Sequence, residues 1–191
     1  MNKKIIMSIV AVTLVVAVGV IAVGCSKGAP KMEFTDTADV INKVVDTYAE
    51  ENKFFAVGGD VGAPVEGKAG LMNLADTEAI NSMLHTNDEL LAEVDEVASL
   101  VHAMNANTFT GGAFKLKDSA KAVEFATSLK DSVLATQWMC GFPEKIVIFN
   151  VNSGDYVVYA IGNGEAVDYF KTQLTTVMGE SAAIVTEEAV A

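Results

Sequence analysis

The stretch KIVIFNVNSGDYVVYAIG, residues 145–162, decides the fold that this sequence predicts. Two runs rich in valine, isoleucine and tyrosine, 145–151 and 156–161, flank the tetrapeptide NSGD, which is typical of the turn of a β-hairpin. Both runs are apolar at successive as well as alternate positions, so each strand should be buried on both faces. We therefore expect a hairpin at the centre of a sheet.

The segment before this hairpin predicts a second pair of strands followed by a helix. A strand over about 97–104 leads to a turn, and residues 109–116 form the next strand, in which Gly111-Gly112 marks a bulge. Asp118 caps the following helix. The apolar face of that helix consists of Ala122, Phe125, Ala126, Leu129 and Val133.

One helix follows the hairpin. Asn163 caps it and Gly179 ends it, because asparagine is a frequent N-cap and glycine a frequent residue just past a helix end. We expect residues 180–191 to form a frayed, flexible tail.

The first half of the domain contains weaker signals. A helix is predicted over 35–52, with Thr35, Asp36 or Thr37 as its cap. The glycine-rich residues 57–70 are a loop or an edge element. Asp76 or Thr77 can cap a short helix that ends near residue 84. The apolar spacing over 87–104 fits a helix throughout, or a short helix followed by the strand from about 97, and the second is our prediction.

The order of elements from residue 97 onward is strand, strand, helix, and this order occurs twice. It predicts an α+β fold, in which an antiparallel sheet of about four strands has its helices packed on one face. The chain is long enough for one domain and short for two. We expect a single globular domain over residues 35–179.

The N-terminal segment is typical of an export signal. Lys3 and Lys4 precede an uncharged run of nineteen residues, Ile5–Val23. Residues 22–25, Ala-Val-Gly-Cys, resemble the lipobox of bacterial lipoproteins, although a larger aliphatic residue is usual at the first position. The resemblance implies that residues 1–24 are a signal peptide cleaved between Gly24 and Cys25. It also implies a diacylglyceryl group on the Cys25 thiol and a tether over 25–34.

An uncleaved membrane anchor is the alternative, because the apolar run nearly matches the roughly 20 residues that span a bilayer. In both cases the two lysines keep the N-terminus in the cytoplasm and send the rest of the chain outward. We therefore expect an extracytoplasmic domain held at the cell membrane, with membrane lipid as the partner of Cys25.

The charge of the chain argues against one large class of partner. The residues after Gly24 carry 25 acidic side chains and 11 lysines, a formal charge of −14, and the chain has no arginine. Proteins that hold phosphates use cationic side chains, and guanidinium is the usual bidentate one. Nucleic acid and anionic lipid head groups are therefore poor partners, and the scattered acidic residues are typical of a soluble surface.

The sequence contains no pattern that predicts catalysis, a cofactor or a metal site. Residues 62–68 fit G-x-x-x-x-G-K, but Ala69 stands where a phosphate-binding loop has Ser or Thr, and Pro64 removes a backbone donor. His85 and His102 belong to no metal-binding motif, and there is no nucleophile turn. We expect a protein that is not an enzyme.

Trp138 and Cys140 are the two residues that we single out for ligand binding or packing. If Cys25 is lipidated, Cys140 is the only remaining thiol, so an internal disulfide is not possible. No base lies near Cys140 in the sequence, so we predict a small buried side chain beside Trp138.

A recognisable combination of features extends over two stretches, GGAFKLKDSAKAVEFATSL (111–129) and QWMCGFPEKIVIFNVNSGDYVVYAIG (137–162). They contain a lysine-rich turn before a helix, a tryptophan-x-cysteine element and a strand pair around Gly154-Asp155. With the lipobox, this combination resembles an uncharacterised family of lipoproteins of Gram-positive bacteria, catalogued as a domain of unknown function. The chain differs at Gln137, where the family often has a basic residue. The resemblance implies an envelope location and no known activity.

These observations predict a membrane-anchored extracytoplasmic lipoprotein whose domain binds a small molecule or an envelope protein. The alternative is a structural or accessory module that docks to a membrane complex through its sheet edge or its helices.

Overall fold

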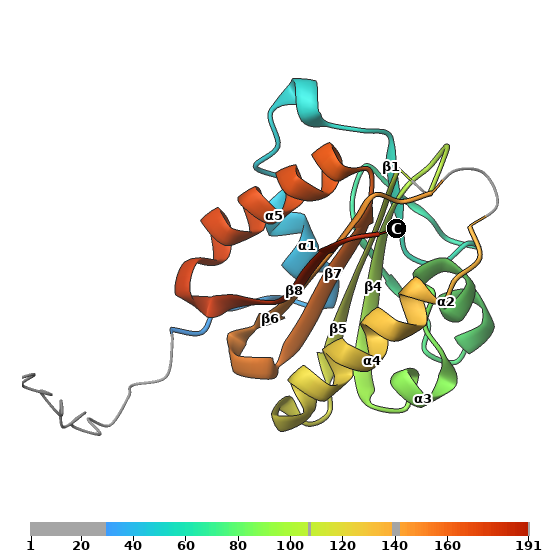
Figure 1. Cartoon of the computed structure of the whole chain (residues 1–191), viewed down its shortest axis with the longest axis vertical. Helices are drawn as coiled ribbons and strands as arrows, with labels where there is room; N and C mark the ends of the chain where they lie inside the picture. Colours follow the sequence, from blue (N-terminus) through green and yellow to red (C-terminus); the bar gives the residue numbers. More distant parts are fainter. Residues whose placement is uncertain (1–29, 107, 139–141, 191) are drawn as a thin grey trace, which may run out of the picture.

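The computed structural model describes residues 30–106, 108–138 and 142–190, whose helices and strands are drawn in Figure 1. The elements, in chain order, are α1 (Thr37–Val45), a 3₁₀ turn (Glu50–Asn52), β1 (Ala56–Gly58), β2 (Val65–Glu66), β3 (Gly70–Met72), α2 (Thr77–Leu84), α3 (Asp88–Leu91), β4 (Val94–His102), β5 (Phe109–Leu116), a 3₁₀ turn (Ser119–Lys121), α4 (Ala122–Leu134), β6 (Lys145–Val151), a 3₁₀ turn (Asn152–Gly154), β7 (Tyr156–Gly162), α5 (Gly164–Met178), a 3₁₀ turn (Gly179–Ser181) and β8 (Ala182–Ala189).

The strands form one sheet in the order β2-β1-β4-β5-β7-β6-β8, with β3 paired to β4 beside β1. Every pair is antiparallel, which confirms the predicted α+β class with an antiparallel sheet. The predicted number of about four strands is wrong, because the described residues contribute eight. Three of the additional strands, β1 to β3, have two or three residues each, too few to show an apolar alternation.

The hairpin predicted from residues 145–162 is confirmed as β6 and β7. β7 lies between β5 and β6, and β6 lies between β7 and β8, so both are interior strands. The turn contains three consecutive residues with positive φ, namely Asn152 at 55°, Ser153 at 60° and Gly154 at 104°. A glycine at the third of these positions allows a φ value that other residues rarely adopt.

Helices cover both faces of the sheet, so the prediction of one helical face is wrong (Figure 1). α1 and α5 pack on one face, against side chains such as Phe149 and Val158. α2, α3 and α4 pack on the other face, against Ile148 and Tyr159 among others. Consecutive strand residues point to opposite faces, so strands that are apolar at every position need a helical layer on each side.

Most predicted helix boundaries are confirmed. The N-caps are Asp76 for α2, Asp118 for the turn that runs into α4, and Asn163 for α5. Asp36 caps α1, but that helix ends at Val45 and not near residue 52. The Val44 carbonyl at the end of the helix accepts two hydrogen bonds from Thr47, from its N–H at 3.1 Å and from its hydroxyl at 2.6 Å.

The glycine pair of β5 does not form the predicted bulge. Gly111 and Gly112 pair in register with Ala160 and Tyr159 of β7. A Cβ atom at Gly112 would lie 2.5 Å from Cε1 of the Tyr159 ring, so this glycine makes room for a buried tyrosine. The register shift in this part of the sheet is in β4 instead, between residues 94 and 96.

The predicted flexible tail is wrong for residues 182–189, because they form β8 and pair with β6. Glu187 of β8 forms ion pairs with Lys145 of β6 and Lys171 of α5, each at 2.6 Å. Asp168 completes a ring with the same two lysines, at 2.7 and 3.0 Å. The strand is held by its ladder and by these four side chains.

The described part of the predicted tether is attached to the domain. The Met32 N–H donates to Asn152 Oδ1 at 2.9 Å, and Asn152 Nδ2 donates to the Met32 carbonyl at 2.8 Å. The Ser181 hydroxyl also donates to the Pro30 carbonyl. The chain therefore enters the domain at the turn between β6 and β7.

No helix within the described residues is both long enough and apolar enough to span a membrane.

Candidate functional site

The predicted site residues are only partly described. Gly24, Cys25 and Cys140 lie outside the described residues, so lipidation, cleavage and the environment of Cys140 stay predictions. Trp138 is described, and it packs against the core that α2, α3 and α4 form with the sheet. Its ring meets the ring of His85 edge-on, with 4.5 Å between the centroids. Trp138 therefore has a packing role, and a role in ligand binding stays a prediction.

His85 closes α2 in a left-handed conformation, with φ at 55°. Its carbonyl accepts a hydrogen bond from the Ser132 hydroxyl at 2.8 Å, which joins α2 to α4. Burial lowers the pKa of the His85 imidazole, because the charged form would lose its hydration. Within the described residues, its buried Nε2 has no hydrogen-bond partner. His85 therefore contributes to the α2–α4 contact, and its surroundings favour the neutral imidazole.

His102 and His85 both line a cavity of about 380 Å³. The His102 Nδ1 accepts hydrogen bonds from the backbone N–H groups of Met104 and Asn105, at 3.3 and 3.2 Å, and the His102 ring stacks on Phe54. In the chain segments that the structure describes, no three His, Cys, Asp or Glu side chains gather where they could hold a metal ion.

The glycine-rich stretch 62–68 does not form a phosphate cradle. Two of its residues belong to β2, and the Gly67 N–H donates to the Ala56 carbonyl at 2.8 Å. A phosphate-binding loop needs such donors free and pointing at the ligand. The geometry of this loop and the lack of a hydroxyl at Ala69 both argue against phosphate binding by its backbone.

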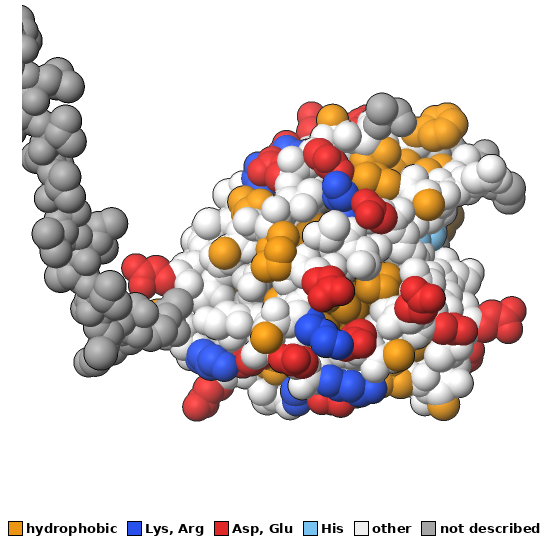
Figure 2. Space-filling model, turned by 60° about the horizontal axis from the view of Figure 1, so that its bottom comes forward, with side chains coloured by type: hydrophobic (Ala, Val, Ile, Leu, Met, Phe, Trp, Pro, Cys, Tyr) orange, Lys and Arg blue, Asp and Glu red, His pale blue; other side chains and the backbone are white. Residues whose placement is uncertain are grey.

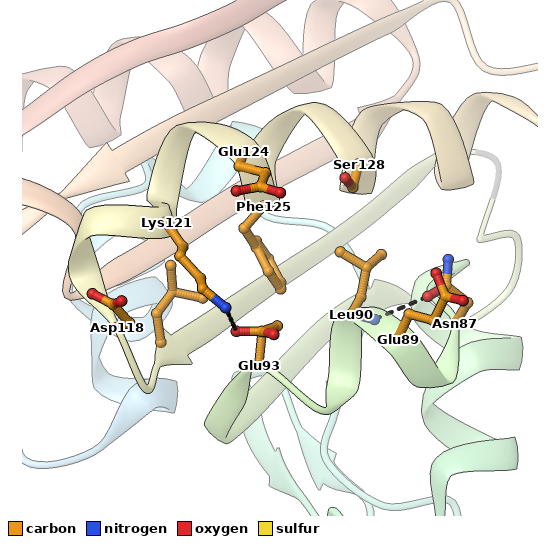
Figure 3. A pocket seen from close by; sticks show the side chains of 10 residues that line it. Asn87, Glu89, Leu90, Glu93, Asp118, Lys121, Glu124, Phe125 and Ser128 are labelled. Carbon is orange, nitrogen blue, oxygen red and sulfur yellow. Dashed lines mark hydrogen bonds and ion pairs between the residues drawn. The ribbon is translucent and has the colours of Figure 1, made fainter.

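A cavity of about 180 Å³ lies between α3 and α4, over the ends of β4 and β5 (Figure 3). Leu90 of α3 and Phe125 of α4 extend toward each other across it, and buried Leu116 adds to its apolar floor. Asn87 and Asp118 at its ends each cap a helical turn through a side-chain oxygen. The cavity thus has rigid apolar walls fixed by two helical elements.

The mouth of this cavity is acidic. Its charged lining consists of Glu89, Glu93, Asp118, Glu124 and Lys121, a formal charge of −3. Lys121 Nζ lies 2.8 Å from Glu93 Oε2 and spans the gap between the two sides (Figure 3). The hydrogen bond and the charge of Glu93, with smaller contributions from Asp118 and Glu124, raise the pKa of the Lys121 amine. The site therefore favours a positive charge near the position of that amine.

Three of these carboxylates, all exposed, form no ion pair within the described part of the chain, namely Glu89, Asp118 and Glu124. Asp118 accepts a hydrogen bond from the Ala120 N–H instead, so Glu89 and Glu124 are the two left for a cation. Figure 2 shows acidic side chains and lysines interspersed on the face that it presents. At the cavity, four carboxylates and one lysine surround an apolar floor.

Sequence reasoning missed this cavity. Asp118 was predicted only as a cap and Phe125 only as part of an apolar helix face, and both roles are confirmed. The sequence does place two acidic residues, Glu89 and Glu93, four positions apart. Acidic pairs at this spacing are common on solvated surfaces, so they did not indicate a site.

No family model, no curated protein and no solved structure matches this chain.

Proposed function

We propose that this chain is a lipid-anchored extracytoplasmic binding domain, without enzymatic activity, that takes a small organic cation into the cavity between α3 and α4. The observation that carries the proposal is the combination of an apolar floor with four carboxylates and a single lysine at the mouth. A ligand with a protonated amine and a small apolar body complements both parts of this lining.

Lys121 indicates how such a ligand would bind. Its amine and Glu93 form an exposed ion pair, with side chains 47% and 42% accessible, and exposed pairs contribute only about 0–1 kcal/mol. A ligand amine can therefore take the place of the lysine beside Glu93 at small cost. Glu89 and Glu124 then supply the second and third negative charges, while Leu90 and Phe125 contact the apolar body.

The anchor rests on the sequence of residues 1–25 and agrees with the position of the first described residues. Met32 bonds Asn152 in the turn between β6 and β7, and the Pro30 carbonyl accepts from Ser181 just before β8, the strand that pairs with that end of β6. Pro30 is five residues after the last residue of the predicted lipobox. At about 3.3–3.6 Å per extended residue, that link holds the hairpin end of the domain within about 18 Å of the lipidated cysteine.

The anchor is tested by mass spectrometry of the protein extracted from membranes. We expect the wild-type chain to begin at Cys25, with a diacylglyceryl group on its thiol. The Cys25→Ala variant should retain an unmodified N-terminal peptide that includes Met1, because lipidation precedes cleavage in the proposed route. A wild-type protein that keeps Met1 and carries no lipid would contradict the proposal and support the uncleaved anchor.

The ligand class is tested by calorimetric titration of the detergent-extracted protein with benzylamine. We expect millimolar or tighter binding, and about 10-fold weaker binding when Glu89→Gln and Glu124→Gln are combined, as two charge-assisted contacts are lost. Glu180→Gln, which removes an exposed carboxylate beyond α5, is the matched control and should leave the affinity unchanged. Equal weakening in the control would indicate bulk electrostatics and contradict a site.

A docking module is the second candidate function, because one end of the sheet exposes large apolar side chains. Val61, Met104 and Phe142 are 71%, 79% and 78% exposed, and the first two line the same open cavity. Co-purification of a fixed envelope partner that is lost in Met104→Ser would support docking.

A further inference from the structure

A second cavity, of about 240 Å³, has the opposite charge to the one between α3 and α4. It lies beyond the C-terminal end of α1, where residues 53–56 lead into β1 and residues 67–68 follow β2. Lys53 and Lys68 line it, with Asp46 as the only carboxylate in the lining. Two lysines in one small cavity are notable in a chain that has 13 lysines and a formal charge of −12.

The floor of this second cavity is apolar. Val45, Phe54, Ala56 and Leu100 contribute to it, and the last two are buried core residues. An apolar floor under two ammonium groups suits a molecule with a compact apolar body and one negatively charged end.

The position of Lys68 is fixed by its neighbours in the chain. The Ala69 N–H donates to Asn42 Oδ1 at 2.9 Å, and Asn42 Nδ2 donates to the Ala69 carbonyl at 3.2 Å. This pair of bonds ties the chain next to Lys68 to α1, so the backbone of the lysine is held at the cavity. The Gly-Lys pair that resembles a phosphate-binding loop in sequence thus does line a cavity, as Gly67 and Lys68.

Both lysines are available to a ligand. Lys68 Nζ is 3.3 Å from Asp46 Oδ1, and Lys53 Nζ is 2.6 Å from Glu50 Oε1. The side chains of these pairs are between 49% and 86% accessible, so solvent screens them. Pairs of this kind are worth about 0–1 kcal/mol and break easily when a ligand supplies a better acceptor.

Tyr48 lines both this cavity and a neighbouring one of about 280 Å³. It is only 7% exposed, and its hydroxyl, which solvent does not reach, has no hydrogen-bond partner within the described residues. The edge-on contact with Tyr169, at 4.7 Å between centroids, accounts for the position of the Tyr48 ring. It does not account for the burial of the hydroxyl. Burial raises the pKa of this hydroxyl, so it remains a donor at every physiological pH. A buried donor without a partner is costly.

From this geometry we infer a second ligand site, at which a small carboxylate with an apolar body binds between Lys53 and Lys68. The carboxylate accepts from the two lysines, and the apolar body contacts Phe54 and the floor beneath it. Inorganic phosphate is a poor occupant, because the nearest loop amide, Gly67 N–H, is already bonded to Ala56.

The test is a calorimetric titration of the detergent-extracted full chain with benzoate, beside benzyl alcohol as the uncharged molecule of the same shape. We expect benzoate to bind and benzyl alcohol not to bind. Lys68→Gln should weaken benzoate binding about 10-fold, the usual effect of losing a charge-assisted hydrogen bond. Lys115→Gln is the matched control, because Lys115 lies at the far end of β5 and does not line the cavity.

Tyr48→Phe tests whether the wall contributes only its shape. The variant should bind benzoate as tightly as the wild type, because the hydroxyl is closed off from the cavity. The melting temperature of the free protein should stay the same or rise, because an unpaired buried hydroxyl is removed. The site is overturned if benzyl alcohol binds as tightly as benzoate, if phosphate binds more tightly, or if Lys115→Gln weakens binding as much as Lys68→Gln. Benzylamine binding should persist in both site variants, so failure here is distinct from failure at the α3–α4 cavity.

Discussion

A chain that ends at Ser181 is expected to lose its folded monomeric state. The deletion removes β8, which pairs with β6 from Lys145 to Val151. It exposes the edge of an apolar strand whose Phe149 and Ile148 are otherwise covered, and such edges pair with other chains. It also removes Glu187, one of the two carboxylates shared by Lys145 and Lys171, and leaves only Asp168 between them. We expect a loss of about 5 kcal/mol or more, comparable to the whole stability of a small domain.

Urea unfolding followed by circular dichroism, with light scattering to detect aggregates, measures this effect. The matched control ends at Ala189 and keeps β8, but it loses the hydrogen bond from the Val190 N–H to the Glu144 carbonyl at 2.9 Å. We expect the control to unfold within about 1 kcal/mol of the full chain. Equal stability of all three chains would mean that residues 182–189 contribute nothing to the fold.

β8 shows why a part of the fold was not predictable from the sequence. Its residues AAIVTEEA include the β-branched run Ile184-Val185-Thr186, but most are half-buried or exposed, with Ile184 at 48%. An edge strand of this kind looks like a frayed tail until its partner is known. The interior strands were predictable because Lys145–Val151 and Tyr156–Gly162 are apolar on both faces, a pattern that has few alternatives.

The layer arrangement was within reach of the sequence. Strands that are apolar on both faces already require cover on both sides, so the prediction of one helical face conflicted with the prediction of buried central strands. The structure resolves the conflict by placing α1 and α5 opposite α2, α3 and α4. Helix caps such as Asp76 and Asn163 were predictable because a cap depends on three or four consecutive residues.

The two cavities were not predictable, because each joins segments that are far apart in the sequence. Glu89 and Glu93 meet Lys121 and Phe125 only when α3 and α4 pack, and Lys68 meets Tyr48 only when Asn42 ties the loop to α1. Each residue also has an ordinary local explanation, as a surface charge or a core aromatic. No spacing rule in one sequence distinguishes these roles from a site.

Gly154→Ala is expected to destabilise the protein by about 3–5 kcal/mol, because two costs add at this residue. The φ of 104° is unfavourable for alanine, at about 1–2 kcal/mol. A Cβ atom there would also lie well inside contact distance of the Ser119 carbonyl oxygen and 3.1 Å from Ala122 Cβ. The turn between β6 and β7 packs on the start of α4, so relief of the clash requires the hairpin or the helix to move.

Two matched glycine variants separate the costs. Gly67→Ala has an unfavourable φ of 71° with no atom within 4 Å of the new Cβ, so it should cost only about 1–2 kcal/mol. Gly62→Ala has neither problem and should be neutral or stabilise the protein by up to about 1 kcal/mol, because it restricts the unfolded chain. Thermal and urea unfolding of the three variants measures the series. If Gly154→Ala costs no more than Gly67→Ala, the hairpin turn is not packed against α4, and the central hairpin must be held by its strands alone.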